Sequence, residues 1–200
     1  MEEIEQDIIA EAGNIGAAHA ATAMGQLLEK TVMISVTRVS EASPGDLSAL
    51  AGDPETLVVG VGFHVVGDAG GRILLWMPRA AGVELVDLLL RQPLGTTKTL
   101  NDLGRSTIKE TGNIMASAYL TGLCEFCGLL LMPTVPAFFF DMSSAVMEMA
   151  AEGVERRGDS RLLVVENAVE AKGCGVSAKL FFFVDASSES ILTENAAGVL

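Results

Sequence analysis

Small and apolar residues recur at three- and four-residue spacing along two long segments of the chain, residues 3–29 and 101–127. This is the period of an amphipathic helix that buries one face, so both segments are predicted to be long helices. Each is followed by extended sequence rich in β-branched and aromatic residues, "TVMISVTRV" after the first and "LLLMPTVPAFFFDM" after the second. The pattern therefore predicts two long helices, each leading into strand.

The remaining segments of the two halves also match in kind. "TLVVGVGFHVV" and "RILLWM", joined at "GDAGG", predict a β-hairpin, and "PRAAGVELVDLLLRQ" predicts a helix with proline in its first turn. In the second half "RLLVVENAVEA" and "KLFFFVDA" predict a hairpin, and "SSESILTENAAGVL" predicts a closing helix. The polar join "QPLGTTKTLND" is short, so we expect the two halves to share one sheet.

A polar triplet on each long helix repeats at a fixed distance, as a duplicated chain would show. The three positions of the first helix recur 99 residues later in the second: Asp7, Glu11 and Asn14, then Ser106, Glu110 and Asn113. We therefore expect an α+β fold with a pseudo-two-fold internal repeat. Its two long helices would pack on a central, mainly antiparallel sheet. Residues 1–200 would form a single domain built of the repeats 1–99 and 100–200.

Residues three and four apart lie on one face of a helix, so each triplet forms a polar strip. Any amphipathic helix has a polar face, and a single E-x-x-N would be ordinary. Here Gly-Asn-Ile closes both triplets, whereas a merely solvated face would accept lysine, glutamine or arginine equally well. A carboxylate can bind a cation on a partner, and an amide can hold a water through one donor and one acceptor. The strips therefore favour docking and water placement over covalent catalysis.

Composition and charge narrow the classes of partner. Half of the 200 residues are hydrophobic, enough for one substantial core. The net charge of −13, with the basic residues scattered, argues against nucleic-acid binding and against an anionic membrane surface. The acidic start "MEEIEQD" does not resemble a secretory signal, and no apolar run approaches the length of a membrane span. We expect a cytoplasmic location and no membrane insertion.

Cysteine and histidine add no expected site. Cys124 and Cys127 form a C-x-x-C inside a helical pattern, without the second pair or nearby histidine that a zinc site needs. Two small, buried residues one helical turn apart are the simpler interpretation, and no metal site is expected. His19 is interpreted as a partly buried helical residue, and His64 as a residue of a strand.

The doubled motif resembles the signature of the CheC family of chemotaxis phosphatases, in the group that also contains CheX and the switch protein FliY. That signature is Asp or Ser, three residues, Glu, two residues, Asn, and a proline at the end of the following strand. "DIIAEAGN" and "STIKETGN" both fit, and Pro136 supplies the later proline of the second copy. The resemblance extends over essentially the whole chain, including "VVGVGF", "VDLLL" and "FFFDM", and two motif copies are typical of CheC rather than CheX.

The first copy departs from this signature in two places. Thr37 stands where the proline would be, and "AAHA" with His19 replaces the commoner Gly-Asn pair after Asn14. Proline fixes φ near −65°, so its absence predicts a less constrained turn in the first copy. From this we expect Asn113 to contribute more to activity than Asn14.

The resemblance implies a phosphatase that hydrolyses the aspartyl phosphate of the response regulator CheY. The asparagines would position the attacking water, and the glutamates would pair with a lysine of the regulator. No intrinsic cofactor is implied, because the regulator would bring its own Mg²⁺. The residues carried over are Glu11, Asn14, Glu110 and Asn113 for catalysis, Asp7 and Ser106 for docking, and Pro136 as a structural element.

The alternative function is a non-catalytic interaction module, a regulatory adaptor that binds phosphorylated CheY or the receptor deamidase CheD, a further partner expected from the resemblance. The segment "FFFDMSSAVMEMAAEG" at 138–153 resembles the region that would contribute the CheD surface. An apolar stripe of Val146, Met147 and Met149 beside Asp141 could serve that partner, although such a stripe is also typical of core. A flagellar switch component is the weaker third interpretation, because no switch-binding domain follows residue 200.

Overall fold

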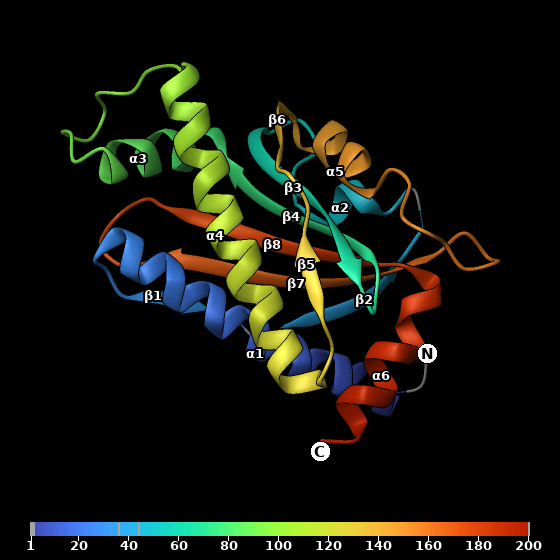
Figure 1. The fold of residues 1–200 in the computed structure, drawn as a ribbon. Coiled ribbons are helices and arrows are strands. Elements are labelled where there is room, and N and C mark those ends of the chain that lie inside the picture. Colours follow the sequence, from blue (N-terminus) through green and yellow to red (C-terminus); the bar gives the residue numbers. More distant parts are fainter. Residues whose placement is uncertain (1–2, 36, 44, 200) are drawn as a thin grey trace.

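Two long helices packed on a curled antiparallel sheet dominate the structure, as the sequence predicts (Figure 1). The computed structural model describes residues 3–35, 37–43 and 45–199. The helices are α1 (Glu3–Leu28), α2 (Leu47–Leu50), α3 (Arg79–Leu89), α4 (Asp102–Cys127), α5 (Ser143–Ala151) and α6 (Glu189–Ala197), with a 3-10 turn, η1 (Ala186–Ser188), before the last. The strands are β1 (Val32–Ile34), β2 (Arg38–Ala42), β3 (Leu57–Gly67), β4 (Gly71–Pro78), β5 (Leu131–Pro133), β6 (Ala137–Met142), β7 (Leu162–Ala171) and β8 (Ser177–Val184).

The two halves of the chain exchange their outer strands within one sheet. The strand order is β1-β7-β8-β4-β3-β5, with β2 also paired to β7 and β6 also paired to β3. The first two strands of each half therefore pair with the hairpin of the other half, and β4 meets β8 in the middle. Since each half completes the sheet of the other, both motif helices rest on a surface that the whole chain builds.

Both faces of the sheet are covered, which explains the unbroken apolar runs in its central strands. On β4, Ile73, Leu75 and Met77 pack into the core under α1, α3, α4 and α6. The alternate residues Leu74 and Trp76 pack into a second core under α2 and α5. Successive side chains on a strand point to opposite faces, so a strand buried on both sides carries no polar alternation. No helix in the described ranges is both long and apolar enough to cross a membrane.

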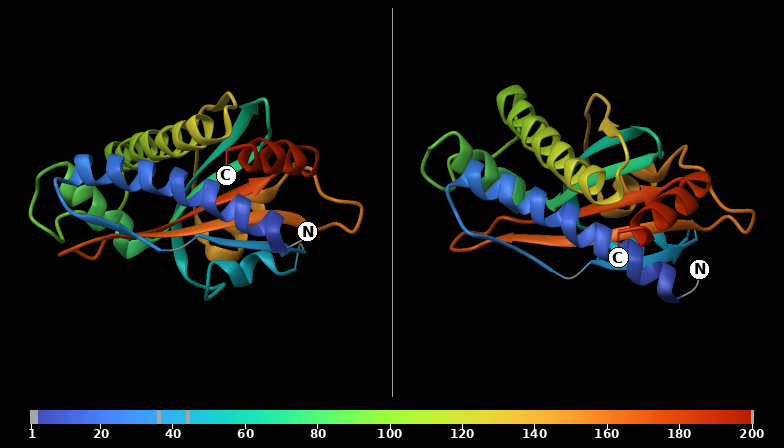
Figure 2. Two further views of the ribbon diagram at one scale, coloured as in Figure 1. Left: turned by 90° about the horizontal axis from the view of Figure 1, so that it is seen from below. Right: turned by 60° about the horizontal axis from the view of Figure 1, so that its bottom comes forward.

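The two long helices lie side by side and run in opposite directions (Figure 2). They meet at two glycines: a Cβ added to Gly122 would lie 3.0 Å from the Cα of Gly16, and one added to Gly16 would lie 3.0 Å from the ring of Tyr119. Because the helices are antiparallel, the beginnings of α1 and α4, which carry the two polar strips, lie toward opposite ends of the helix pair.

The glycine of each Gly-Asn-Ile sequence lets its helix approach the sheet closely. A Cβ added to Gly13 would lie 2.8 Å from the side chains of Thr37 and of Val165 on β7. A Cβ added to Gly112 would lie 2.9 Å from the Cβ of Val61 on β3. Real Cβ atoms do not approach this closely in a well-packed core, so any larger residue would push the helix outward. The repeated glycine thus has a structural reason that is the same in both halves.

A buried carboxylate organises the connection between the two halves. Asp87, at the end of α3, is fully buried and accepts hydrogen bonds from the backbone N–H groups of Gly95, Thr96 and Thr97 at 2.6–3.0 Å. The side-chain amide of Gln92 donates a further bond at 2.8 Å. Hydrogen bonds from Thr97, together with those from Gln92 and Gly95, lower the pKa of Asp87 to about 2. The charged carboxylate therefore fixes the loop that leads into α4.

The apolar stripe that the sequence marks as a partner surface lies mostly in the core. Val146 and Met147 on α5 are fully buried against the sheet, and Met149 is half-buried against the same core. Asp141, on β6, is the exposed one among these four residues. The interpretation of this stripe as a partner surface is wrong, because the helical spacing reflects packing of α5 on the second face of the sheet.

Replacing Gly112 with alanine should destabilise the protein by about 1–3 kcal/mol, since the added methyl would overpack against Val61. For a chain of this size the melting temperature should fall by about 2–4 °C for each kcal/mol. The matched control is Gly104→Ala on the same helix, where the nearest atom to the added Cβ lies 3.4 Å away. Alanine is the better helix former, so the control should be neutral or slightly stabilising. Equal melting temperatures for the two variants would contradict the close-packing argument.

Replacing Asp87 with asparagine should lower the melting temperature at neutral pH by several degrees, because a neutral amide oxygen accepts hydrogen bonds more weakly than a carboxylate. The pKa of Asp87 is lowered by folding, so its contribution is complete above the ordinary aspartate pKa of about 4. The contribution is lost as the pH falls from about 4 toward about 2, and the difference from wild type should shrink over that window. Thermal scans across this range check it, with the exposed acid change Glu148→Gln as control. A difference that does not vary with pH would show that the charge of Asp87 is unimportant.

Candidate functional site

The polar strips lie on the outer faces of the two long helices, as predicted. The acids and the serine are exposed, whereas both asparagines are half-buried at the inner edge of their strips. The exposed members are Asp7 and Glu11 on α1, and Ser106 and Glu110 on α4. Each strip therefore presents a carboxylate to solvent and holds its amide closer to the sheet.

The second copy of the motif opens into a hollow of about 620 Å³ between α4 and the β5–β6 connection. Its lining comprises Ser106, Lys109, Glu110 and Asn113 from the helix and Pro133, Thr134, Val135 and Pro136 from the connection. The structure thus brings the predicted residues of this copy together, with the predicted proline in the facing wall. Within the described part of the chain, the side-chain amide of Asn113 makes no hydrogen bond. Its donor and acceptor both remain available to a molecule that enters the hollow.

The connection facing each motif helix is anchored to the sheet in the same way. In the second copy the Thr134 N–H donates to the His64 carbonyl at 2.9 Å, and the His64 N–H donates to the Thr134 hydroxyl at 3.1 Å. In the first copy the Ser35 N–H donates to the Ala168 carbonyl at 2.9 Å, and the Ala168 N–H donates to the Ser35 hydroxyl at 2.9 Å. Ser35 and Thr134 are separated by the same 99 positions as the motif residues. Neither hydroxyl belongs to the motif, although the shared offset of 99 positions could have revealed both.

Two residues further along, the two copies differ. The backbone N–H of Thr37 donates to the side-chain oxygen of Asn14 at 3.0 Å, and the Thr37 hydroxyl accepts from the side-chain amide of Asn167 on β7. Pro136 occupies the corresponding position of the second copy and has no N–H. Thr37 is only 7 % exposed and is held on both sides. The expectation of a less constrained turn in the first copy is therefore wrong: hydrogen bonds replace the rigidity of proline.

Charge also distinguishes the two copies. Lys109 lines the hollow of the second copy, and Arg105, one turn earlier on α4, lies with its guanidinium 5.7 Å from the centre of the Phe138 ring. The equivalent positions of α1, 99 residues earlier, are Gln6 and Ala10. The second strip thus has one acid, Glu110, and two cations beside it, whereas the first has two acids and neutral residues at the positions of those cations. Comparison of the repeats at these positions would have identified Lys109, which the motif does not include.

The cysteines and histidines lie outside these sites. Cys127 is buried, and burial raises the pKa of its thiol to about 11. The Cys124 sulfur accepts a hydrogen bond from the Leu131 N–H at 3.1 Å. Nowhere in the described ranges do three or more His, Cys, Asp or Glu side chains gather as a metal site would need. His19 is half-buried on α1 with its Nε2 atom 3.9 Å from the Glu125 carboxylate, and the His64 side chain is exposed on β3.

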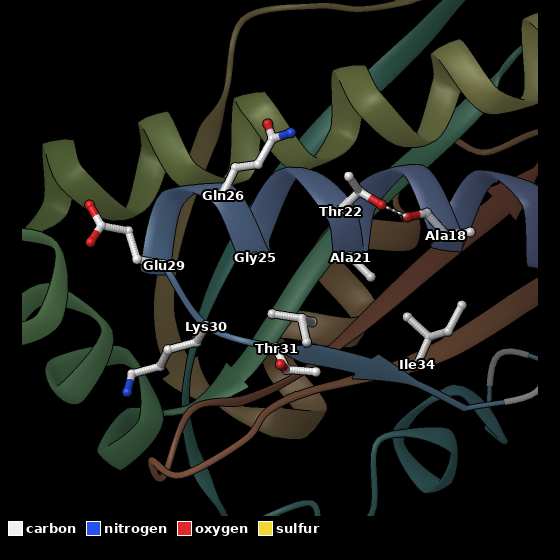
Figure 3. A pocket seen from close by; sticks show the side chains of 10 residues that line it. Ala18, Ala21, Thr22, Gly25, Gln26, Glu29, Lys30, Thr31 and Ile34 are labelled. Carbon is white, nitrogen blue, oxygen red and sulfur yellow. Dashed lines mark hydrogen bonds between the residues drawn. The ribbon is translucent and has the colours of Figure 1, made fainter.

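A further hollow, of about 630 Å³, lies between the second half of α1 and β1 (Figure 3). Its walls are mainly small side chains of α1, such as Ala18, Ala21 and Gly25. Gln26 and Glu29 extend away from β1, and the Glu29 carboxylate pairs with Arg91 at 2.9 Å. No motif residue lines this hollow, so it does not contribute to the candidate site.

The site as built suits a partner that docks over an exposed helix. Phosphoryl transfer passes through a loose transition state in which the catalyst mainly positions groups and stabilises charge. An amide with a free donor and acceptor can orient a water, and the neighbouring carboxylate can pair with a cation on the docked molecule. Neither group has to form a covalent bond with the substrate, and the docked molecule would complete the site.

Comparisons with known proteins identify relatives of this chain. Residues 4–39 match the sequence model of the CheC-like family. The chain is 30% identical over 166 residues to the CheY-P phosphatase CheC of Bacillus subtilis, a match that covers 82% of this chain and 79% of that protein.

Solved structures share the fold. FliY of Thermotoga maritima superposes with a TM-score of 0.76 at 20% identity and covers 100% of this chain and 99% of its own. CheX in the CheX–CheY–BeF3–Mg²⁺ complex of Borrelia burgdorferi superposes with a TM-score of 0.56 at 16% identity, covering 86% of this chain and 96% of its own. Identity and coverage with the Bacillus protein, extending well beyond the first motif helix, show that the chain belongs to the CheC-like family.

Proposed function

We propose that this protein hydrolyses the aspartyl phosphate of phosphorylated CheY, with the hollow of the second motif copy as its principal site. The observation that carries the proposal is the unengaged amide of Asn113 beside the exposed carboxylate of Glu110, on a helix face open to a docking partner. A curated relative is named for this activity, and a protein of the same fold has been solved in complex with CheY.

In the proposed mechanism Asn113 enters the active site of the regulator and orients the attacking water. Its side-chain oxygen accepts a hydrogen from that water, and its NH2 group donates toward the phosphoryl oxygens. The water lies in line with the scissile bond between phosphorus and the aspartyl oxygen, so water adds to phosphorus as the aspartate leaves. The products are the unmodified aspartate and inorganic phosphate.

The acids of the strips serve docking in this proposal. Glu110 and Glu11 pair with a lysine of the regulator and thereby fix the register of the helix. Ser106 and Asp7, one turn earlier, extend the contact along the same face. The proposal assigns Mg²⁺ to the regulator, where it would neutralise charge on the phosphoryl group. A cytoplasmic location fits the three free cysteines of the described structure.

Replacing both Asn14 and Asn113 with alanine should reduce the acceleration of dephosphorylation by on the order of 10²-fold, the usual effect of losing a positioning group. Asn14→Ala also removes the bond from Thr37, so a stability loss of about 0.5–1.5 kcal/mol is expected from that change alone. Release of labelled phosphate from a phosphorylated CheY, measured beside a melting curve, checks both effects. Gln26→Ala, an exposed amide on α1 outside the motif, is the control and should keep full activity. A double variant with full activity would exclude the proposed mechanism.

Reversing the acids, with Glu11→Lys and Glu110→Lys together, should weaken docking more than chemistry, because lysine would face the lysine of the regulator. The expected result is about a tenfold increase in KM, with kcat changed less than about threefold. Rates measured over a range of regulator concentrations separate the two constants. Glu148→Lys on α5, on the opposite face of the sheet, makes the same charge change away from the site. Unchanged KM with reduced kcat would place the glutamates in the chemical step instead.

A non-catalytic adaptor remains the second candidate, and the edge of β6 is the observation that favours it. This strand pairs with β3 on one side, and Phe140 and Met142 are 43% and 46% exposed on either side of the exposed Asp141. Exposed apolar side chains on a strand at the edge of a sheet are typical of a protein-binding surface. CheD is the partner predicted from the family resemblance. Binding of CheD or phosphorylated CheY without any faster phosphate release would favour the adaptor over the phosphatase.

A further inference from the structure

We infer that the backbone N–H of Thr37 holds the Asn14 amide against the protein itself, so that the first motif copy docks a regulator without positioning the water. This inference rests on the proposed function. Thr37 is then a positioning residue that acts through Asn14, because its backbone N–H is a donor that Pro136 of the second copy lacks.

The comparison between copies isolates that hydrogen. Both connections carry the same pair of anchoring bonds, through Ser35 in one copy and Thr134 in the other. Both motif glycines approach the sheet within the same short distance. Two residues beyond the anchoring hydroxyl, Thr37 provides a donor where Pro136 provides none. The anchor and the glycine are equivalent, so the Thr37 donor is the hydrogen-bonding difference between the surroundings of Asn14 and those of Asn113.

Thr37 is itself fixed, which makes the restraint on Asn14 firm. Its hydroxyl accepts from Asn167, a fully buried residue of β7, and its side chain packs beside Gly13. The hydrogen bond from Asn167 and the packing beside Gly13 therefore hold Thr37 where its N–H reaches Asn14. The bond occupies one of the two lone pairs of the Asn14 oxygen and directs this oxygen toward the β1–β2 connection. A water on a docked regulator would then have to reach the remaining lone pair of an oxygen that is held at this connection.

The charges on the two helices also favour the second copy as the one that approaches the phosphoryl group. The beginning of α1 carries Glu3, Glu5, Asp7 and Glu11, with neutral residues at the positions where α4 carries Arg105 and Lys109. A phosphoryl group is an anion, so it approaches the second strip against less repulsion than the first. The first copy is thus suited to contacting a lysine on the regulator, and less suited to approaching the phosphorus.

The test uses the Asn113→Ala background, in which any remaining acceleration comes from the first copy. Adding Thr37→Pro removes the N–H and should raise kcat about tenfold with KM nearly unchanged, because the Asn14 oxygen becomes free to accept from water. Thr37→Ala is the matched comparison: it loses the hydroxyl and the bond from Asn167 but keeps the N–H, so it should show no gain. A third change, Asn14→Ala, should abolish the gain. No increase in a stably folded Thr37→Pro variant, or an equal gain from Thr37→Ala, overturns the inference.

The reciprocal change keeps the test decisive if Thr37→Pro does not fold. In the Asn14→Ala background, Pro136→Thr gives the second copy an N–H opposite Asn113 and should lower kcat about tenfold. Unaltered kcat in that variant overturns the inference.

Hydrogen exchange tests the bond without any assay of activity. The Thr37 amide should be protected in the wild-type protein and exchange about tenfold faster in Asn14→Ala. Unchanged exchange overturns the inference. A wild-type protein that fails to accelerate phosphate release would instead overturn the proposed function, and a Thr37 amide that Asn14 protects would show that the restraint exists nonetheless.

Discussion

The close contact between each motif helix and the sheet is the constraint on which the rest of this structure depends. Gly13 and Gly112 have no Cβ, so α1 and α4 rest directly on valines of β7 and β3. The asparagine that follows each glycine is thereby placed next to the connection after the first strand of its repeat. A larger residue would move the helix away from the sheet and separate the amide from that connection.

Strand exchange makes this contact a property of the whole chain. α1 belongs to the first half but packs on β7 of the second, and α4 belongs to the second half but packs on β3 of the first. The closest approach of each helix to the sheet is therefore to a strand of the other half. The strands of the two halves are therefore interleaved in one sheet, and each motif helix packs on a strand of the other half.

Equivalent scaffolds allow the two sites to diverge through single groups. The anchoring hydroxyls, the glycines, the glutamates and the asparagines are common to both copies. One difference is Thr37 against Pro136, and the others change charge: Gln6 against Arg105, Asp7 against Ser106 and Ala10 against Lys109. The Thr37 difference decides whether the asparagine oxygen accepts a hydrogen bond from its own chain. The other differences change the charge of the helix face around the asparagine. Because packing elsewhere is conserved between the copies, these changes can alter chemistry without altering the fold.

The sequence by itself determined the elements and the motif of this protein. Helical and strand periods are local, so α1, α4 and both hairpins could be read from a few neighbouring residues, and the 99-residue offset revealed the duplication. The tertiary structure alone decided what each residue faces. The spacing of Val146 and Met147 is compatible with a binding stripe, but in the structure both side chains are buried against the sheet. Thr37 in place of proline predicts a loose turn, but its N–H donates a hydrogen bond to Asn14. Such contacts join residues 23 to 130 positions apart, and no local pattern encodes a hydrogen bond between a backbone donor and a side chain on another element.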